Sequence, residues 1–452
     1  MKRNAIDNLI LWKDKIGNNW NKPVLITGAK GVGKTYLAYD FANSFFSQTF
    51  YINLEKDQRI RGLLSSGDPD SICKLLSDYR PINKENIDIT DTLNKDNIVF
   101  ILDEISYLPD IEGVIEILLE LQGKSMLTPY ILLTSSKPLS AEVMAKTYPV
   151  KLFPLTFDEF LLATGNDWYI EAIRTHYDNC KPLPEIVHNE LISLYQLYLE
   201  IGGMPSAVNE YLHMNSTINI MEHHDVIMGA YKYDITNSNS DNNTLKILQV
   251  FDSISYQLKK ANKKFQYRLI RKGTTYGHYK EAIDYLINNN LVIQSNKIPN
   301  DQLTNSSSVK DFQPLDANFK LYMPDTGLLF TQFLQQLPLN LKFTAEPVTH
   351  NMYTDSKIYK TLIENNVAQT LNANHYSLWY WESNSSAKIN FIIEKDTRLI
   401  PVEIFHGTNT RSKSVSIFKK HCDIPYGIKI SSNNFAFVNQ VKYLPIYATF
   451  CL

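Results

Sequence analysis

The segment that decides the fold is KPVLITGAKGVGKTYLAYDFA, residues 22–42. Its apolar run over residues 24–27 predicts a buried strand, and the spacing of apolar residues after Lys34 predicts a helix. Residues 28–35 lie between the two and fit the pattern GxxxxGK followed by Ser or Thr. Glycines let backbone N–H groups curl around a phosphate, and the helix start directs its dipole at the anion. A chance match in an unrelated glycine turn is the alternative, and the flanking strand and helix argue against it.

Residues 28–35 therefore form a predicted phosphate-binding loop (P-loop, or Walker A motif), with ATP and Mg²⁺ as its expected ligands. Lys34 is expected to reach the β- and γ-phosphates, and the Thr35 hydroxyl is expected to ligate magnesium. The loop as a whole is expected to hold the phosphate chain through its residues Gly28, Ala29, Lys30, Gly31, Val32, Gly33, Lys34 and Thr35.

A second apolar run, Ile98 to Leu102, leads into two acids, Asp103 and Glu104, within NIVFILDEISYLPD. A strand that is apolar on both faces is typical of a parallel sheet, and such sheets bind ligands at the carboxyl ends of their strands. We expect Asp103 to hold the magnesium shell and Glu104 to act as the general base on the attacking water. The glutamate favours hydrolysis over mere binding. Two solvated acids at the end of a strand are the alternative.

Composition limits the remaining possibilities. With 452 residues the chain is long enough for about three domains. No apolar run approaches the roughly 18 residues of a membrane span, and the N-terminus lacks the apolar core of a secretory signal. A net charge of −2 argues against a globally basic nucleic-acid binder. The four cysteines are dispersed along the chain and form no CxxC pair. This spacing argues against a zinc site and a disulfide framework, and it favours a reducing, cytoplasmic location. The cysteines are Cys73, Cys180, Cys422 and Cys451.

Further motifs along the chain point to one group of proteins. They are FYINLE (50–55), PLTFDEF (154–160), GGMP (202–205), KKFQYRLIRKG (263–273), FKLYMPDTGLL (319–329) and WYWESNSSAKINFIIEKDTRLIPVEIFHG (379–407). In this order, and with the P-loop, the chain resembles bacterial and archaeal AAA-type ATPases of the additional-strand branch. Those proteins carry a winged-helix segment and an uncharacterised C-terminal domain of restriction-endonuclease-like type.

The resemblance implies an α/β protein built on a parallel P-loop sheet. The implied parts are an ATPase core (1–155), a helical lid (156–237), a winged-helix-like domain (238–330) and a restriction-endonuclease-like domain (331–452). Within them, helical spacing over 184–201 ends at the C-cap candidates Gly202 and Gly203. The polar residues 238–243 predict a linker, and residues 245–293 predict three helices followed by a short β-rich tail.

The resemblance also implies a polar contact to the γ-phosphate and the water at the end of a third strand, within TPYILLTSS. Ser135 is assigned this catalytic role, with Ser136 as the alternative. Where similar proteins show an arginine before the PLTFDEF segment, the nearest basic residues are Lys146 and Lys151. The arginine-finger role therefore stays unassigned.

A basic run interleaved with aromatic residues crosses the predicted winged helix. It favours a local patch for DNA phosphates. A solvated helical face, or a surface that contacts the protein's own ATPase part, is the alternative. The residues assigned to DNA are Lys259, Lys260, Lys263, Lys264, Arg268, Arg271 and Lys272.

The C-terminal part is expected to follow the order α-β-β-β-α-β, beginning with a helix over 357–371. In active relatives of the restriction-endonuclease-like fold, four positions carry Glu, Asp, Glu and Lys. Here those positions fall on Glu364, Asn390, Glu403 and Phe405. Asn390 offers a neutral carbonyl where a hard cation prefers a carboxylate, and Phe405 cannot replace a lysine. Lys388 on a neighbouring strand is a possible substitute. The sequence therefore predicts a nuclease scaffold that has lost its activity.

Three functions follow from these features. The first is an Mg²⁺-dependent ATPase whose nucleotide state switches the arrangement of its other parts. The second is an ATP-gated DNA-binding protein. The third is an interaction protein that holds ATP without hydrolysing it, and Glu104 speaks against that reading.

Overall fold

The computed structural model describes residues 1–16, 21–65, 67–68, 98–124, 130–217, 219–303, 308–315, 318–336, 356–384 and 386–452. Cys73 lies outside them. The chain divides into two compact units, residues 2–153 and residues 154–452. The boundaries predicted within the second unit, at 237 and 330, stay predictions. Among the described residues, no helix combines the length and apolarity that crossing a bilayer requires.

The first unit is built on a five-stranded parallel sheet with the strand order β2-β3-β4-β1-β5. Strand β4 lies between β1 and β3, so the additional strand that the resemblance implies is present. The strands predicted at 24–27 and 98–102 are β1 and β3, and β3 extends to include Asp103. The bounds are β1 (Val24–Thr27), β2 (Gln48–Asn53), β3 (Ile98–Asp103), β4 (Ile131–Ser135) and β5 (Tyr148–Lys151).

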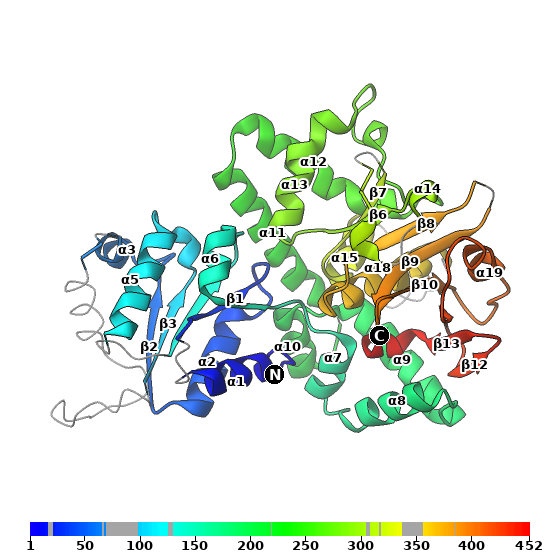
Figure 1. The fold of residues 1–452 in the computed structure, drawn as a ribbon, viewed down its shortest axis with the longest axis horizontal. Helices are drawn as coiled ribbons and strands as arrows, with labels where there is room; N and C mark the ends of the chain where they lie inside the picture. Colours follow the sequence, from blue (N-terminus) through cyan, green and yellow to red (C-terminus); the bar gives the residue numbers. More distant parts are fainter. Residues whose placement is uncertain are drawn as a thin grey trace. The chain divides into compact units, whose positions relative to one another are not determined.

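Helices cover both faces of this sheet, which explains why every residue of β3 and β4 is buried. Helices α3, α5 and α6 pack on one face and α2 on the other, with α1 against α2 (Figure 1). The helix predicted after Lys34 is α2. The bounds are α1 (Ile6–Lys15), α2 (Lys34–Phe45), α3 (Gln58–Leu64), the 3-10 turn η2 (Ile105–Tyr107), α5 (Ile111–Gly123) and α6 (Ala141–Lys146).

The second unit begins with a run of helices. Helix α7 opens on a capping box in which Thr156 and Glu159 satisfy each other's backbone N–H groups, which accounts for the PLTFDEF motif. Helix α9 ends at Gly202, whose φ of 71° suits glycine, so this predicted C-cap is confirmed. The bounds are α7 (Phe157–Ala163), α8 (Trp168–Asn179), α9 (Glu185–Ile201), α10 (Pro205–Met214) and α11 (Ile220–Ser238).

Two expectations for the next region are wrong. Residues 238–243 are not a linker, because α11 ends at Ser238 and α12 begins at Asp241. The predicted three helices are two, with only a 3-10 turn between α12 and α13. The bounds are α12 (Asp241–Leu258), η3 (Tyr267–Leu269), α13 (Tyr276–Asn288), β6 (Ile293–Lys297), α14 (Asn300–Leu303), η4 (Val309–Asp311), β7 (Phe319–Tyr322) and α15 (Thr326–Gln335).

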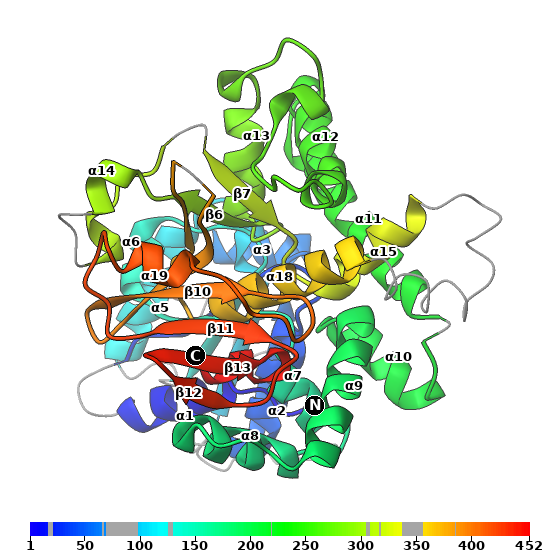
Figure 2. The ribbon, with the colours of Figure 1, turned by 90° about the vertical axis from the view of Figure 1, so that its right-hand side faces the viewer.

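An eight-stranded mixed sheet fills the rest of the second unit, with the order β12-β13-β11-β10-β9-β8-β6-β7 (Figure 2). The predicted α-β-β-β-α-β order is present as α18, β8, β9, β10, α19 and β11. Strand β6 pairs in parallel with β8, so the hairpin after α13 extends the C-terminal sheet. The bounds are α18 (Ser356–Ala373), β8 (Trp379–Glu382), β9 (Lys388–Lys395), β10 (Arg398–Ile404), α19 (Ser414–Phe418), β11 (Gly427–Ser431), β12 (Ala436–Val438), β13 (Val441–Pro445) and η5 (Ile446–Cys451).

Asp325 connects the GGMP motif to PDTG (324–327), which lies within the FKLYMPDTGLL motif. Its buried carboxylate accepts a hydrogen bond from the Gly203 N–H at 2.6 Å and another from the Leu328 N–H at 3.1 Å. The second bond caps the start of α15. A Cβ on Gly203 would overlap the backbone of Leu155, so only glycine fits beside this carboxylate. The two motifs therefore join α9, α10 and α15 into one framework.

His224 on α11 is fully buried in the same framework. Its Nε2 lies 2.9 Å from the Ile201 carbonyl and its Nδ1 lies 2.8 Å from the Thr331 hydroxyl. A neutral imidazole satisfies both contacts, donating from Nε2 and accepting at Nδ1. Burial lowers the pKa of His224 to about 4, from an ordinary value of 6.5.

This shift predicts acid sensitivity of the second unit. Because the folded-state pKa lies below the unfolded one, the unfolded chain binds more protons between about pH 4 and 6.5. Stability is therefore lost as the pH falls through that window, by up to roughly 3 kcal/mol. In chemical denaturation at several pH values, His224→Gln should flatten this slope. The exposed control His213→Gln should keep it, and equal slopes in the two variants would refute the assignment.

Candidate nucleotide-binding site

The loop of residues 28–35 joins β1 to α2 and has the backbone geometry that its glycines predict. Gly33 is the N-cap of α2 and has a φ of 94°, a left-handed value that disfavours a side chain. A Cβ on Gly28 would overlap the Leu152 carbonyl, so the loop can pass β5 only with glycine there. The start of α2 thus lies at the carboxyl ends of the parallel strands.

Lys34 folds back over this loop. Its side chain is 5% exposed, and its ammonium group lies 3.2 Å from the Gly28 carbonyl and 3.3 Å from the Ala29 carbonyl. The Glu104 carboxylate is 3.4 Å from the same ammonium group. Burial lowers the pKa of Lys34, and the opposing charge of Glu104 partly offsets that effect. A buried cation inside a ring of backbone dipoles is suited to receive phosphate oxygens.

Asp103 lies at the centre of a hydrogen-bond network. Its carboxylate accepts from the Thr35 hydroxyl at 3.0 Å, the Thr134 hydroxyl at 2.5 Å and the Tyr51 hydroxyl at 2.7 Å. These donors come from α2, β4 and β2, so four elements meet at one carboxylate. The Thr35 hydroxyl and a single carboxylate, with phosphate oxygens to complete the shell, form the oxygen donor set that Mg²⁺ takes beside a nucleotide.

Glu104 follows Asp103 in a left-handed backbone conformation, with a φ of 60°. Its N–H donates to the Thr134 hydroxyl at 2.9 Å. Its carboxylate accepts from both the N–H and the hydroxyl of Ser136, at 2.9 and 2.7 Å. Residues with a side chain rarely adopt this conformation, and here three hydrogen bonds stabilise it. They hold the Glu104 carboxylate in an orientation that points toward Lys34.

The geometry does not favour the choice of Ser135 over Ser136. The Ser135 hydroxyl donates to the Lys137 carbonyl at 2.8 Å and is engaged in the turn that ends β4. Ser136 is the serine that contacts Glu104. Lys146, one of the two basic residues considered near this strand, is paired with Glu116 and Glu142 on the helices that carry them.

Two features of this region were missed by the sequence reasoning. Tyr51 contacts Asp103, and the pKa of its phenol is raised by burial and by that bond. Glu55 accepts from the Tyr107 hydroxyl at 2.9 Å and lies 3.4 Å from the Lys30 ammonium group. The FYINLE motif contains Tyr51 and Glu55, and its position at the carboxyl end of strand β2 was the available signal.

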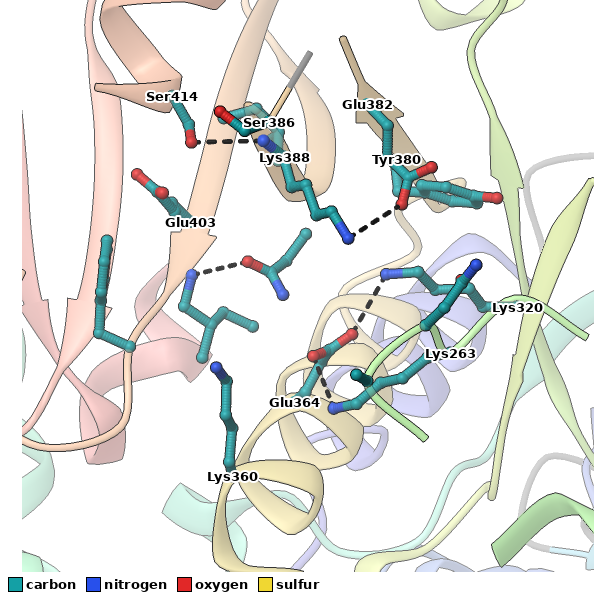
Figure 3. Close-up of a pocket in the computed structure, with 16 residues that line it drawn as sticks. Lys263, Lys320, Lys360, Glu364, Tyr380, Glu382, Ser386, Lys388, Glu403 and Ser414 are labelled. Atoms are coloured by element: carbon teal, nitrogen blue, oxygen red, sulfur yellow. Dashed lines mark hydrogen bonds and ion pairs between the residues drawn. The ribbon is translucent and has the colours of Figure 1, made fainter. Parts of the chain in front are cut away.

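A second polar site lies in the other unit, where the four predicted nuclease positions line one pocket of about 300 Å³ (Figure 3). Glu364 is held there by the ammonium groups of Lys263 at 2.8 Å and Lys320 at 3.3 Å. Burial alone would raise the pKa of Glu364, but the two cations outweigh it and hold the pKa well below its usual value. The lysines neutralise the carboxylate that a metal ion would need.

The remaining nuclease positions are also committed to internal contacts. The Asn390 carbonyl accepts from the Ile404 N–H at 3.0 Å, and the Phe405 ring lies under the Lys429 ammonium group. One oxygen of Glu403 accepts from the Ser412 hydroxyl, and burial raises the pKa of this glutamate. Lys388, the possible substitute, lies 3.9 Å from Glu382 (Figure 3). In the part of the chain that the structure describes, no cluster of three metal-ligating His, Cys, Asp or Glu side chains occurs.

The basic run does not form one exposed patch. The Lys263 side chain is buried against Glu364, and Lys264 forms an ion pair with Glu382 at 2.9 Å. Arg268, Arg271 and Lys272 are exposed. Carboxylates more than a hundred residues away in the sequence thus pair with Lys263 and Lys264, and the assignment of these two lysines to DNA stays a prediction.

Comparison with known families locates an AAA-type domain. Residues 20–161 match the family described as AAA domain. Residues 192–340 and 359–449 match two families described as domains of unknown function, DUF8612 and DUF4143. Among curated proteins there is no match. Most of the first unit thus matches the AAA domain family.

Several solved structures are similar to this chain at low identity. A Walker-type ATPase of Pyrococcus abyssi is 15% identical, with a TM-score of 0.42 over 74% of this chain and 95% of that one. AMPPCP-bound DnaA from Aquifex aeolicus is 13% identical, with a TM-score of 0.31 over 63% and 86%. The RuvB branch migration motor of Thermotoga maritima is 12% identical, with a TM-score of 0.31 over 63% and 88%. The likeness concerns the fold alone.

The buried pairing of Lys263 is testable by unfolding. Lys263→Ala should lower the free energy of unfolding by roughly 1–3 kcal/mol, because Glu364 keeps only one cation. Lys272→Ala, an exposed lysine of the same basic run, should stay within about 0.5 kcal/mol of the native chain. Urea denaturation followed by circular dichroism measures both. Equal stability of the two variants would show that Lys263 does not support Glu364.

Proposed function

We propose that this protein binds ATP with Mg²⁺ at residues 28–35 and hydrolyses it, using Glu104 as the general base. The observation that carries the proposal is the position of Glu104. It follows the Asp103 carboxylate, lies 3.4 Å from the Lys34 ammonium group and is fixed by Ser136. An ATP-binding protein without turnover has no need for a second, oriented carboxylate at this point.

The side chains have separate roles in this proposal. The loop N–H groups and Lys34 bind the β- and γ-phosphates, while Thr35 and Asp103 hold Mg²⁺, which supplies charge neutralisation on the phosphates. Lys34 now contacts two carbonyls and Glu104. A γ-phosphate competes for that ammonium group, and Glu104 is then released to accept a hydrogen bond from the attacking water. Ser136 keeps the carboxylate oriented during this exchange.

The nucleotide state would then act as a conformational switch. Lys34 on α2, Thr35 on α2 and Asp103 on β3 would hold the γ-phosphate and Mg²⁺ together only in the ATP form, so these residues would lose shared contacts after hydrolysis. The parts proposed to respond are a helical lid (156–237), a winged-helix-like part (238–330) and a restriction-endonuclease-like part (331–452). We propose that the last is inactive as a nuclease, because Glu364 is neutralised by lysines.

DNA binding is the second candidate, and it rests on fewer residues than the sequence indicated. Lys259, Lys260, Arg268, Arg271 and Lys272 remain available, and none of them forms an ion pair within the described residues. Exposed lysines and arginines of this kind contact phosphates and make binding salt-dependent.

The roles of Lys34 and Glu104 separate binding from turnover. Lys34→Ala should abolish ATP binding, because the phosphates lose their buried cation. Glu104→Gln should retain ATP and lose turnover by about a hundredfold or more. Equilibrium binding of a fluorescent ATP analogue and phosphate release measure the two steps, with exposed Glu120→Gln as the control. Native turnover in Glu104→Gln would exclude this base. ATP that copurifies unhydrolysed with the native chain would favour an interaction protein instead.

The two serines at the end of β4 give a matched pair of variants. Ser136→Ala should lower the rate of ATP turnover by about tenfold, because the carboxylate of Glu104 loses a hydroxyl bond of roughly 1.5 kcal/mol. Ser135→Ala removes a hydroxyl that bonds only within the turn and should leave the rate nearly unchanged. The same phosphate-release assay decides between them, and the opposite order would restore Ser135 to the catalytic role.

A further inference from the structure

A pocket of about 540 Å³ lies in the second unit between the end of α12 and the start of α18. It adjoins the pocket that contains Glu364, and the two share Ala261, Lys263 and Lys360. Five of its lining residues are lysines, and no carboxylate is among the described residues that line it. The lining residues are Tyr256, Lys259, Lys260, Ala261, Lys263, Gln336, Lys357, Lys360 and Thr361.

Among the described residues, the positive charge of this pocket is only partly balanced by carboxylates. Glu364 neutralises Lys263, but Lys259, Lys260 and Lys360 form no ion pair in the portion of the chain that the structure describes. Lys260 instead lies over the Tyr256 ring at 4.3 Å from its centroid. The neighbouring pocket differs, because there three glutamates accompany four lysines. The excess of positive charge is therefore larger in this pocket than in its neighbour.

The location of two of these lysines makes the excess costly. Lys357 and Lys360 lie in the first two turns of α18, where the helix dipole is positive and disfavours cations. Lys263 lies close enough to Lys360 for the two charges to repel. Like charges gathered at the positive end of a helix destabilise the chain unless an anion joins them. Lys259 and Lys260, by contrast, lie at the C-terminal end of α12, where the negative end of the helix dipole favours cations.

We propose that this pocket is a second phosphate-binding site, distinct from residues 28–35, that takes a ligand with at least two neighbouring phosphates. Lys259 and Lys260 bind it from α12 and Lys360 binds it from α18. The phosphates come either from the free phosphate chain of a nucleotide or from successive phosphates of a nucleic-acid strand. The pocket volume admits a phosphate chain and one nucleoside, and the Tyr256 ring at its rim offers a surface for a base.

The test uses the full chain carrying Lys34→Ala, so that the P-loop does not contribute to binding. One probe is inorganic tripolyphosphate, measured by calorimetry. The other is a short fluorescein-labelled single-stranded oligonucleotide, measured by anisotropy at two salt concentrations. In this background the triple variant Lys259→Gln, Lys260→Gln, Lys360→Gln is compared with Lys181→Gln, Lys310→Gln, Lys420→Gln. The control removes the same number of charges from exposed lysines outside the pocket.

The pocket variant should bind at least about tenfold more weakly than the control. For the oligonucleotide, the slope of log affinity against log salt should fall by about 0.7 for each lost phosphate contact. If the pocket variant binds both probes more weakly than the control does, a free phosphate chain is a sufficient ligand. If only its affinity for the oligonucleotide falls, the ligand is a nucleic-acid backbone. Equal affinities of the pocket and control variants, or no binding of either probe by the Lys34→Ala chain, would overturn the proposal.

Folding and function are controlled separately. The three lysines are partly or fully exposed, so both triple variants should keep the unfolding midpoint of the parent chain. Lys360→Gln alone is the milder variant and should weaken binding in the same direction. No step of this test measures ATP turnover, so its outcome is independent of the proposed function at the P-loop.

Discussion

The structure of the first unit depends on the carboxylate of Asp103. Asp103 is 2% exposed, and its carboxylate accepts hydrogen bonds from the hydroxyl groups of Thr35, Tyr51 and Thr134. A buried carboxylate must be paired or fully hydrogen-bonded, so this one fixes the positions of α2, β2 and β4 against β3. Glu104, the next residue, is oriented by the same network, because its N–H donates to the Thr134 hydroxyl. The arrangement of the candidate nucleotide site thus depends on the hydrogen bonds of one buried carboxylate at the carboxyl edge of a parallel sheet.

The second unit satisfies a buried carboxylate in the opposite way. Glu364 receives two lysine ammonium groups and a tyrosine hydroxyl from distant parts of the chain. The pair of cations fills the electrostatic role of a metal ion and needs no ligand from solvent. A buried charge deprived of such partners is strongly destabilising, so these lysines support the fold first. Lys259, Lys260 and Lys360, which form no ion pair among the described residues, line the adjoining pocket, which is the proposed site for a further anion.

Local patterns predicted much of the first unit and less of the second. The strands at β1 and β3 and the loop between β1 and α2 were predicted because each depends on neighbours within a few residues. Long-range contacts were not predicted. The charge of Lys263 is visible in the sequence, but its pairing with Glu364, 101 residues away, is not. The parallel pairing of β6 with β8 was missed for the same reason. The choice between Ser135 and Ser136 depended on the turn after β4, which side-chain type alone does not reveal.

The most direct test of the central claim is calorimetric titration of the native chain with ATP, with and without Mg²⁺, beside the same titrations of Asp103→Ala. We expect the native chain to release or absorb heat on binding ATP, and to bind it with higher affinity when Mg²⁺ is present. We expect Asp103→Ala to lose this dependence on Mg²⁺, while Lys34 still binds the phosphates. Absence of heat from the native chain with either ATP or GTP would contradict the assignment of residues 28–35 as a phosphate-binding loop.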